Sequence, residues 1–244
     1  MSSARSSAAE PRTTPPTGTA SSARAAEVAP VTSPAVAILI PAFDEQLTIA
    51  AVVRTAVASG LGPVIVIDDG SRDATAAVAA DAGAEVVRLA VNSGKGGALA
   101  AGARHVENEF VVLLDADLVG LGTQHIVALA DPVLSGSADM SRGVFKGGRL
   151  TTTLAQLMAP QLNGQRCLRR EALLGVPGLA ESRYGVEVVI TRHGLDRGWR
   201  LVEVPLWGVT QVMKEEKRGL LAGLKARARM YWQITRSLLS DRRR

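Results

Sequence analysis

Four short, largely apolar runs dominate the first half of the chain. They are rich in β-branched residues and cover residues 36–40, 64–67, 85–89 and 110–114. Apolar runs of this length, without polar alternation, are typical of parallel strands that are buried on both faces. Alanine-rich segments that favour helices separate the runs, at 47–58, 74–82 and 98–106. This order predicts right-handed βαβ units, and therefore an α/β fold with a mostly parallel central sheet and helices on both of its faces.

The pattern is less regular in the second half of the chain, after Asp117. The expected elements are helices at 124–134 and 185–195 and strands at 139–144 and 199–204, the last strand closed by Pro205. Residues 147–163 mix Gly, Thr and Pro and predict no element. Because no linker-like stretch or internal repeat interrupts these segments, we expect residues 36–213 to form one continuous domain.

The two ends of the chain differ from this domain in composition. Residues 1–35 are mostly Ser, Ala, Thr and Pro without an aromatic residue, which predicts a disordered tail. Residues 214–244 hold ten basic and three acidic residues, so the formal charge of +5 belongs to this end of the chain. Apolar residues recur there at helical spacing, namely Leu221, Leu224, Ala228, Tyr231 and Leu238. We predict a basic amphipathic helix that either packs on the domain or lies on an anionic membrane surface.

Composition excludes several classes of protein. No apolar run reaches the roughly 18 residues of a membrane span, and the tail lacks the apolar core of a secretory signal. We therefore expect a cytoplasmic protein, peripheral at the inner membrane face if its C-terminal helix binds lipid. The only cysteine, Cys167, excludes disulfide scaffolds and cysteine zinc clusters. Aromatic residues make up 3% of the chain, too few for stacking on single-stranded nucleic acid, so no nucleic-acid partner is expected. The sequence leaves open whether the protein forms a homodimer.

Each of the four predicted strands ends in polar or loop-forming residues, at 41–45, 68–73, 91–97 and 115–117. Ligands of an open parallel sheet bind outside the carboxyl ends of its strands. Because all four polar segments follow such ends, we expect them to meet at one edge of the sheet. The sequence therefore predicts a ligand site there.

The residue types at this edge indicate the chemistry of the ligand. Asp115 and Asp117 form a carboxylate pair of the kind that holds Mg²⁺ or Mn²⁺ together with substrate phosphate oxygens. Residues 94–97, Gly-Lys-Gly-Gly, offer backbone amides and a cation to phosphate, although they match neither a P-loop nor a dinucleotide fingerprint. Asp73 is expected to cap the following helix, which leaves Asp69 for the ligand.

Residues 40–45, 66–75, 92–96 and 114–117 resemble, in this order, the successive motifs of the family 2 glycosyltransferases. The resemblance covers residues from about 36 to 120 and implies a GT-A (Rossmann-like) fold. It also implies transfer of a sugar from a nucleotide diphosphate sugar with Mg²⁺ or Mn²⁺. The resemblance implies that the wall around the base and ribose is formed by Pro41, Ala42, Phe43 and Glu45, and that Asp69 is the partner of the base. It further implies that Lys95 contacts the diphosphate and that Asp115 and Asp117 bind the metal and the donor. Asp117 is thereby a predicted catalytic residue. The family usually has Asn where Asp44 stands.

Segments in the second half of the chain resemble more specific groups of glycosyltransferases. Segments 147–151, 163–166 and 184–187 are similar to segments of glucosyl-3-phosphoglycerate synthases, and 164–166 also resemble polyprenyl-phosphate sugar transferases. From these segments we expect acceptor binding by Arg149, Thr151, Gln165 and Arg166. Glu187 is the candidate catalytic base, or else a helix N-terminal carboxylate favoured by the dipole. The synthases have a metal-binding His after their last strand, where Gln211 stands nearest in this chain.

The predicted function is a metal-dependent glycosyltransferase that moves a sugar from a nucleotide diphosphate sugar to an acceptor, for which a lipid-linked compound is one candidate. One alternative is transfer to a small phosphorylated acceptor, in the manner of the glucosyl-3-phosphoglycerate synthases. Another alternative is a sugar nucleotidyltransferase, which would carry a Gly-rich phosphate loop directly after the first strand. Residues 41–45 contain no Gly.

Overall fold

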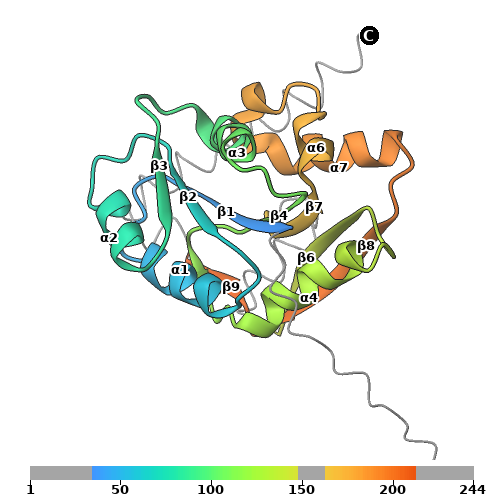
Figure 1. Cartoon of the computed structure of the whole chain (residues 1–244), viewed down its shortest axis with the longest axis horizontal. Coiled ribbons are helices and arrows are strands. Elements are labelled where there is room, and N and C mark those ends of the chain that lie inside the picture. Colours follow the sequence, from blue (N-terminus) through green and yellow to red (C-terminus); the bar gives the residue numbers. More distant parts are fainter. Residues whose placement is uncertain (1–34, 148–162, 213–244) are drawn as a thin grey trace, which may run out of the picture. The chain divides into compact units, whose positions relative to one another are not determined.

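A computed structural model describes residues 35–147 and 163–212. Its main sheet has seven strands in the order β3-β2-β1-β4-β7-β6-β8 (Figure 1). The strands are β1 (Val36–Ala42), β2 (Val64–Asp68), β3 (Glu85–Arg88), β4 (Phe110–Leu113), β6 (Met140–Lys146), β7 (Arg166–Arg169) and β8 (Leu201–Trp207). Only β7 runs against its two neighbours, so the expectation of a mostly parallel sheet is confirmed. Two short strands, β5 (Leu118–Val119) and β9 (Thr210–Gln211), form a separate antiparallel pair.

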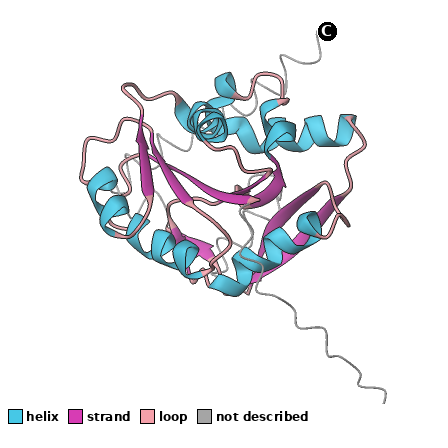
Figure 2. Cartoon of the chain, in the orientation of Figure 1, coloured by secondary structure: helices cyan, strands magenta, loops and turns pink. Residues whose placement is uncertain are grey.

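Helices cover both faces of the sheet, as Figures 1 and 2 show. One face packs against α1 (Ile49–Ala58), α2 (Thr75–Asp81) and α4 (Thr123–Leu134). The other face packs against α3 (Gly94–His105), α6 (Arg170–Leu174) and α7 (Val186–Asp196), with the 3-10 helix η2 (Ala180–Gly185) beside α3. The α/β class expected from the sequence is therefore confirmed.

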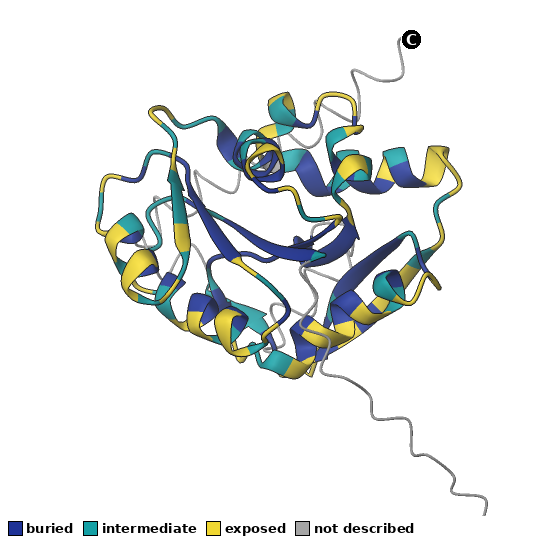
Figure 3. Ribbon diagram, viewed as in Figure 1, coloured by how far each residue is buried: buried dark blue, intermediate teal, exposed yellow. Residues whose placement is uncertain are grey.

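Strand β1 is covered on both faces, which explains why its sequence is apolar at every position. Ile38 and Ile40 belong to the core cluster beneath α1 and α4, whereas Ala37 and Leu39 belong to the cluster beneath α3. A strand covered on both faces has no polar side to alternate with. Figure 3 shows this strand as buried along almost its whole length, with Pro41 half-buried.

Two strands continue through a proline at which the sequence predicts an end. Strand β1 runs on to Ala42. Pro41 is tolerated within it because the pairing with β4 ends at Leu39, so Pro41 pairs with β2 alone. Strand β8 continues through Pro205 to Trp207, opposite Val144 of β6. Because β8 is the edge strand of the sheet, a missing N–H is tolerated there.

Helix α3 begins at Gly94, earlier than the predicted start at residue 98. Glycines disfavour a helix by about 1 kcal/mol each, which hid this first turn from the sequence pattern. The structure requires Gly96, because a Cβ there would overlap the carbonyl oxygen of Leu179 and Oγ of Ser182. Close packing of α3 on η2 thus outweighs helix propensity. Within the described ranges, no helix is long and apolar enough to span a bilayer.

Candidate active site

The centre of the site is one ammonium group shared by two carboxylates. Lys95 lies in the first turn of α3, Asp115 follows β4, and Glu187 lies in the first turn of α7. Nζ of Lys95 donates hydrogen bonds to Oδ1 of Asp115 and, at 2.5 Å, to Oε1 of Glu187. Burial alone would lower the pKa of Lys95, but the two negative charges and their hydrogen bonds outweigh it and raise the pKa above its usual value. Lys95 is therefore charged at neutral pH.

Two amides meet the other oxygen of Asp115. Nε2 of Gln165 and Nε2 of Gln211 donate to Oδ2 of Asp115 at 2.9 and 2.5 Å. Gln165 is completely buried, and its Oε1 has no hydrogen-bond partner within the part of the chain that the structure describes. Gly164 allows this approach, since a Cβ at that position would collide with Asp115 and with Nζ of Lys95.

The second predicted aspartate, Asp117, is half-buried and precedes β5. Its backbone oxygen accepts a hydrogen bond from the amide of Val212 at 3.1 Å, next to the pairing of Leu118 with Gln211. These backbone contacts bring the strand that carries Gln211 to the carboxylate turn. No group of three or more His, Cys, Asp or Glu suited to a metal lies among the described residues. Carboxylate and amide oxygens are nevertheless the donors that Mg²⁺ or Mn²⁺ takes when phosphates complete its shell, so the residues present fit such a cation.

Asp69 joins two of the strand-end loops. Its Oδ1 accepts hydrogen bonds from the amide and the hydroxyl of Ser93 at 2.7 and 2.9 Å, and its Oδ2 accepts one from the amide of Gly94 at 2.8 Å. These are groups at the N-terminus of α3, so the described contacts make Asp69 a cap of that helix. The predicted cap, Asp73, accepts the amide of Thr75 at 2.9 Å at the start of α2.

The loop after β1 is held by the loop after β2. Asp44 has a left-handed backbone with φ of 55°, and its amide donates to Oγ of Ser71 at 3.0 Å. Oδ1 of Asp44 accepts the amide of Arg72 at 3.0 Å, and the amide of Glu45 donates to Oγ1 of Thr75 at 2.8 Å. Asn and Asp both tolerate this conformation, so the Asp at position 44 keeps the geometry that an Asn would have. Of the other residues predicted to form the base and ribose wall, Ala42 is buried, and Pro41 and Phe43 are half-buried.

Arg166 lies behind Glu187 and is completely buried. Its Nη1 donates to Oγ1 of Thr191 at 2.9 Å, and its Nη2 donates to the backbone oxygen of Glu187 at 3.1 Å. Burial lowers the pKa of Arg166 to about 10, although the charge of Glu187 opposes the shift. The predicted contact of Arg166 with an acceptor stays a prediction. Arg149 and Thr151, also predicted to bind the acceptor, lie outside the described residues.

The structure thus brings Lys95, Asp115, Gln165 and Glu187 into one hydrogen-bonded cluster. Sequence reasoning missed the buried contacts of Arg166 with Thr191, and nothing local to Thr191 signals them. It also missed the close approach at Gly164, although the Gly-Gln-Arg segment drew attention to its neighbours. The cluster combines a cation, two carboxylates and amide donors, which is a set suited to anionic substrates and proton transfer.

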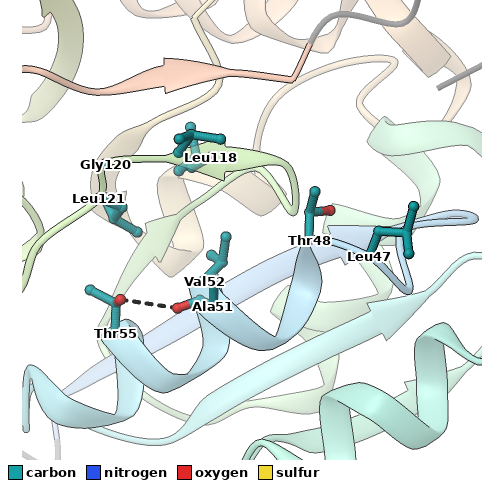
Figure 4. Close-up of a pocket in the computed structure, with 9 residues that line it drawn as sticks. Leu47, Thr48, Ala51, Val52, Thr55, Leu118, Gly120 and Leu121 are labelled. Atoms are coloured by element: carbon teal, nitrogen blue, oxygen red, sulfur yellow. Dashed lines mark hydrogen bonds between the residues drawn. The ribbon is translucent and has the colours of Figure 1, made fainter. Parts of the chain in front are cut away.

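A separate groove of about 230 Å³ lies between α1 and the turn at β5. Figure 4 shows Thr48, Val52 and Thr55 on one side and Leu118 and Leu121 on the other. None of the described residues that line this groove is titratable. Its lining therefore offers shape and apolar surface without acid–base chemistry.

Comparison with known proteins identifies relatives of the chain. The model of the family described as "Glycosyl transferase family 2" matches residues 37–180. Glycosyltransferase AglJ of Haloferax volcanii is 32% identical over 193 residues, which cover 71% of this chain and 63% of AglJ. Glucosyl-3-phosphoglycerate synthase of Mycolicibacterium paratuberculosis is 28% identical over 246 residues, covering 84% of this chain and 71% of the synthase. The chain thus spans less than two thirds of AglJ.

Solved structures of similar fold include glucosyl-3-phosphoglycerate synthase from Mycobacterium tuberculosis. Its complex with Mn²⁺, uridine diphosphate and glucosyl-3-phosphoglycerate matches with a TM-score of 0.66 and 26% sequence identity. The match covers 84% of this chain and 78% of that one. A complex of the same synthase with Mg²⁺ and uridine diphosphate matches equally well, with a TM-score of 0.66 and 27% identity. The fold of the domain is accordingly that of these GT-A enzymes.

Proposed function

Because this chain belongs to glycosyl transferase family 2, we propose that it transfers a sugar from a nucleotide diphosphate sugar to a phosphorylated acceptor. The observation that carries the proposal is the sharing of Lys95 between Asp115 and Glu187 at the carboxyl edge of the sheet. Family membership argues against the alternative of a sugar nucleotidyltransferase. The similar synthases, whose structures hold Mn²⁺ or Mg²⁺ with uridine diphosphate, support a metal-dependent reaction.

In the proposed donor site, Lys95 and the amides at the N-terminus of α3 bind the diphosphate. Asp115 and Asp117 would hold a Mg²⁺ or Mn²⁺ ion, which when bound would help to neutralise the leaving diphosphate. Pro41, Phe43 and Glu45 remain the proposed wall for the base and ribose. Asp69 is proposed to act on the donor through α3, since its oxygens hold that helix, and its contact with the base stays a prediction.

In the proposed chemical step, the acceptor oxygen forms a bond to the anomeric carbon of the sugar. The bond from that carbon to the diphosphate breaks, and its electron pair leaves with the nucleotide diphosphate. Glu187 takes the proton of an acceptor hydroxyl. The buried carboxylate of Glu187, held beside Lys95, supports this role because it lies next to the group proposed to bind the donor.

The acceptor is proposed to be a small phosphorylated compound with a free hydroxyl. Similarity to the glucosyl-3-phosphoglycerate synthases supports this class. Arg149, Thr151 and Gln165 are its proposed binding residues, while Arg166 acts from behind Glu187. A lipid-linked acceptor is the second candidate, and the basic composition of residues 214–244 favours it.

We propose the division of the whole chain into segments from its sequence. It comprises a tail at 1–35, the GT-A domain at 36–213 and an amphipathic segment at 214–244. A cytoplasmic location, peripheral membrane association and a homodimer all remain predictions.

A panel of nucleotide diphosphate sugars tests the function. The full chain would be incubated with each sugar nucleotide and Mg²⁺ or Mn²⁺, with and without phosphoglyceric acid, while release of the nucleotide diphosphate is measured. We expect release that depends on the metal and increases with the acceptor, and a melting temperature that rises with nucleotide diphosphate and metal together. The matched control is Lys95→Met, which should lose both responses. Absence of release and of a thermal shift with every donor would overturn the proposal.

A further inference from the structure

We propose that Arg166 is a positioning residue for Glu187, a buried cation that fixes the first turn of α7 so that the Glu187 carboxylate stays aligned on the reacting hydroxyl. The inference rests on the proposed function, because it concerns the same site. Arg166 itself contacts no substrate in this proposal, since its guanidinium is bonded to α7.

Hydrogen bonds tie Arg166 to the helix that carries Glu187. Arg166 lies at the start of β7, in register with Leu113 of β4. Its Nη2 reaches the backbone oxygen of Glu187 at 3.1 Å, and its Nη1 reaches Oγ1 of Thr191 at 2.9 Å. Oγ1 of Thr191 in turn donates to the same oxygen of Glu187 at 2.7 Å. Two hydrogen bonds therefore connect the sheet to α7, and a third, within α7, converges on the same carbonyl of its first turn.

The charges around Glu187 give Arg166 a second role. Lys95 divides its ammonium between Glu187 and Asp115, and in the proposed reaction it also serves the diphosphate. Arg166 is not shared with the donor in this way, because its guanidinium is completely buried and hydrogen-bonded to α7. It retains its charge at neutral pH, since burial lowers its pKa only to about 10 and Glu187 counteracts the shift. Arg166 thus supplies a fixed positive charge behind the carboxylate when Lys95 is engaged by the donor.

A structural role alone does not account for this choice of residue. Taking a guanidinium out of water is costly, and a well-packed apolar side chain would support the sheet as well. The neighbouring residue Arg142, opposite Arg166 in the β6–β7 register, provides a comparison. Arg142 is also buried and its charge acts on Arg166, but its ion pair is with Glu203 of β8, on the side away from β7. Arg142 is therefore the matched control for loss of a buried arginine.

A double-mutant cycle in the full chain tests the inference. Its variants are Arg166→Met, Glu187→Gln and the combination, assayed for kcat and for the donor KM. We expect Arg166→Met to lower kcat at least tenfold with the donor KM within about twofold, because donor contacts are unchanged. If Arg166 acts through Glu187, the double variant will be no slower than Glu187→Gln alone. Arg166→Lys, which keeps the charge, should recover part of the loss.

The control Arg142→Met is expected to lower the melting temperature, and any loss of kcat should multiply with that of Glu187→Gln. If Arg166→Met fails to fold, Thr191→Val serves instead, since it removes the hydroxyl between Arg166 and Glu187 while keeping the shape. Thr191→Val should lower kcat several-fold, without further loss in the Glu187→Gln background.

Multiplying effects of Arg166→Met and Glu187→Gln would overturn the inference, as would a Glu187→Gln variant of unchanged kcat. A wild-type chain that transfers no sugar from any donor would instead overturn the proposed function.

Discussion

At the scale of single residues, the site is a balance of buried charges. Two carboxylates, Asp115 and Glu187, compete for the ammonium of Lys95, and the fixed guanidinium of Arg166 lies behind one of them. Removing one partner of a buried ion pair leaves an uncompensated charge, which is usually more harmful than removing both. Substitutions in this cluster should therefore reduce activity and stability together. Asp117, which is half-buried and outside the cluster, should separate the two effects.

We predict that Asp117→Ala abolishes transfer and leaves the fold intact. The substitution removes a proposed metal carboxylate at a partly exposed turn, where a loss of stability above about 1 kcal/mol is not expected. Activity in saturating Mn²⁺ should fall at least a hundredfold, while the melting temperature stays within a few degrees. Asp81→Ala, an exposed aspartate at the end of α2, is the control and should change neither quantity. Unchanged turnover of the Asp117→Ala variant would remove this residue from the mechanism.

Gly164 offers a second test at the same scale. A methyl group there would overlap Asp115 and Nζ of Lys95, so Gly164→Ala must push this ion pair apart. We expect it to lower kcat/KM at least a hundredfold and to weaken the thermal shift caused by nucleotide diphosphate. The control is Gly175→Ala, where a Cβ meets only carbonyl oxygens of the preceding helix at 3.2 and 3.6 Å. Equal activity of the two variants would contradict the close packing of the site.

At the scale of elements, local sequence predicts the strands and helices whose own residues show a clear apolar pattern. Strand β2 and helix α4 occur within a residue of the predicted bounds. Strand β7 was missed because its sequence, Arg-Cys-Leu-Arg, has an arginine that is buried only after α7 packs over it. Lys95 and Asp115 were found from local motifs, whereas Gln165 and Glu187 were found through family resemblance. The contacts of Arg166 with α7 join residues distant in sequence, and no local pattern reports them.

Helix α3 depends on a distant cap, which leads to a prediction. Asp69 accepts three hydrogen bonds from Ser93 and Gly94, so Asp69→Ala takes the partner from the buried amide of Gly94 and from the half-buried amide and hydroxyl of Ser93. We expect a loss of unfolding free energy of about 1–3 kcal/mol. Because Lys95 lies in the same turn, donor binding should weaken as well. Urea denaturation and the nucleotide-induced thermal shift measure the two effects.

The control for this prediction is Asp73→Ala, which removes a half-buried side chain that accepts the amide of Thr75 at the start of α2. It should cost less stability and leave donor binding unchanged. A variant Asp69→Ala with normal stability and weakened nucleotide binding would instead favour the predicted contact of Asp69 with the base.

At the scale of the molecule, the two sides of the site come from different parts of the chain. The proposed donor side, with Lys95 and Asp115, lies within residues 37–180, which match the family model. Glu187 and Gln211 lie beyond that match, on α7 and β9. The proposed base, Glu187, is therefore encoded outside the shared match, whereas the proposed acceptor residues Arg149, Thr151 and Gln165 lie within it.

The last prediction concerns residues 214–244, which lie outside the described part of the chain. Their basic residues and the apolar repeat from Leu221 to Leu238 predict attraction to anionic lipid, at about 1 kcal/mol for each basic residue near the surface. The full chain should sediment with vesicles containing anionic phospholipid and stay in solution with neutral vesicles. Binding should weaken with salt, which screens these charges. Truncation after Met230 removes Arg236 and the three terminal arginines and should abolish binding, while sugar transfer to a soluble acceptor persists. Failure of the full chain to bind anionic vesicles even at low salt would leave packing on the domain as the role of the apolar stripe.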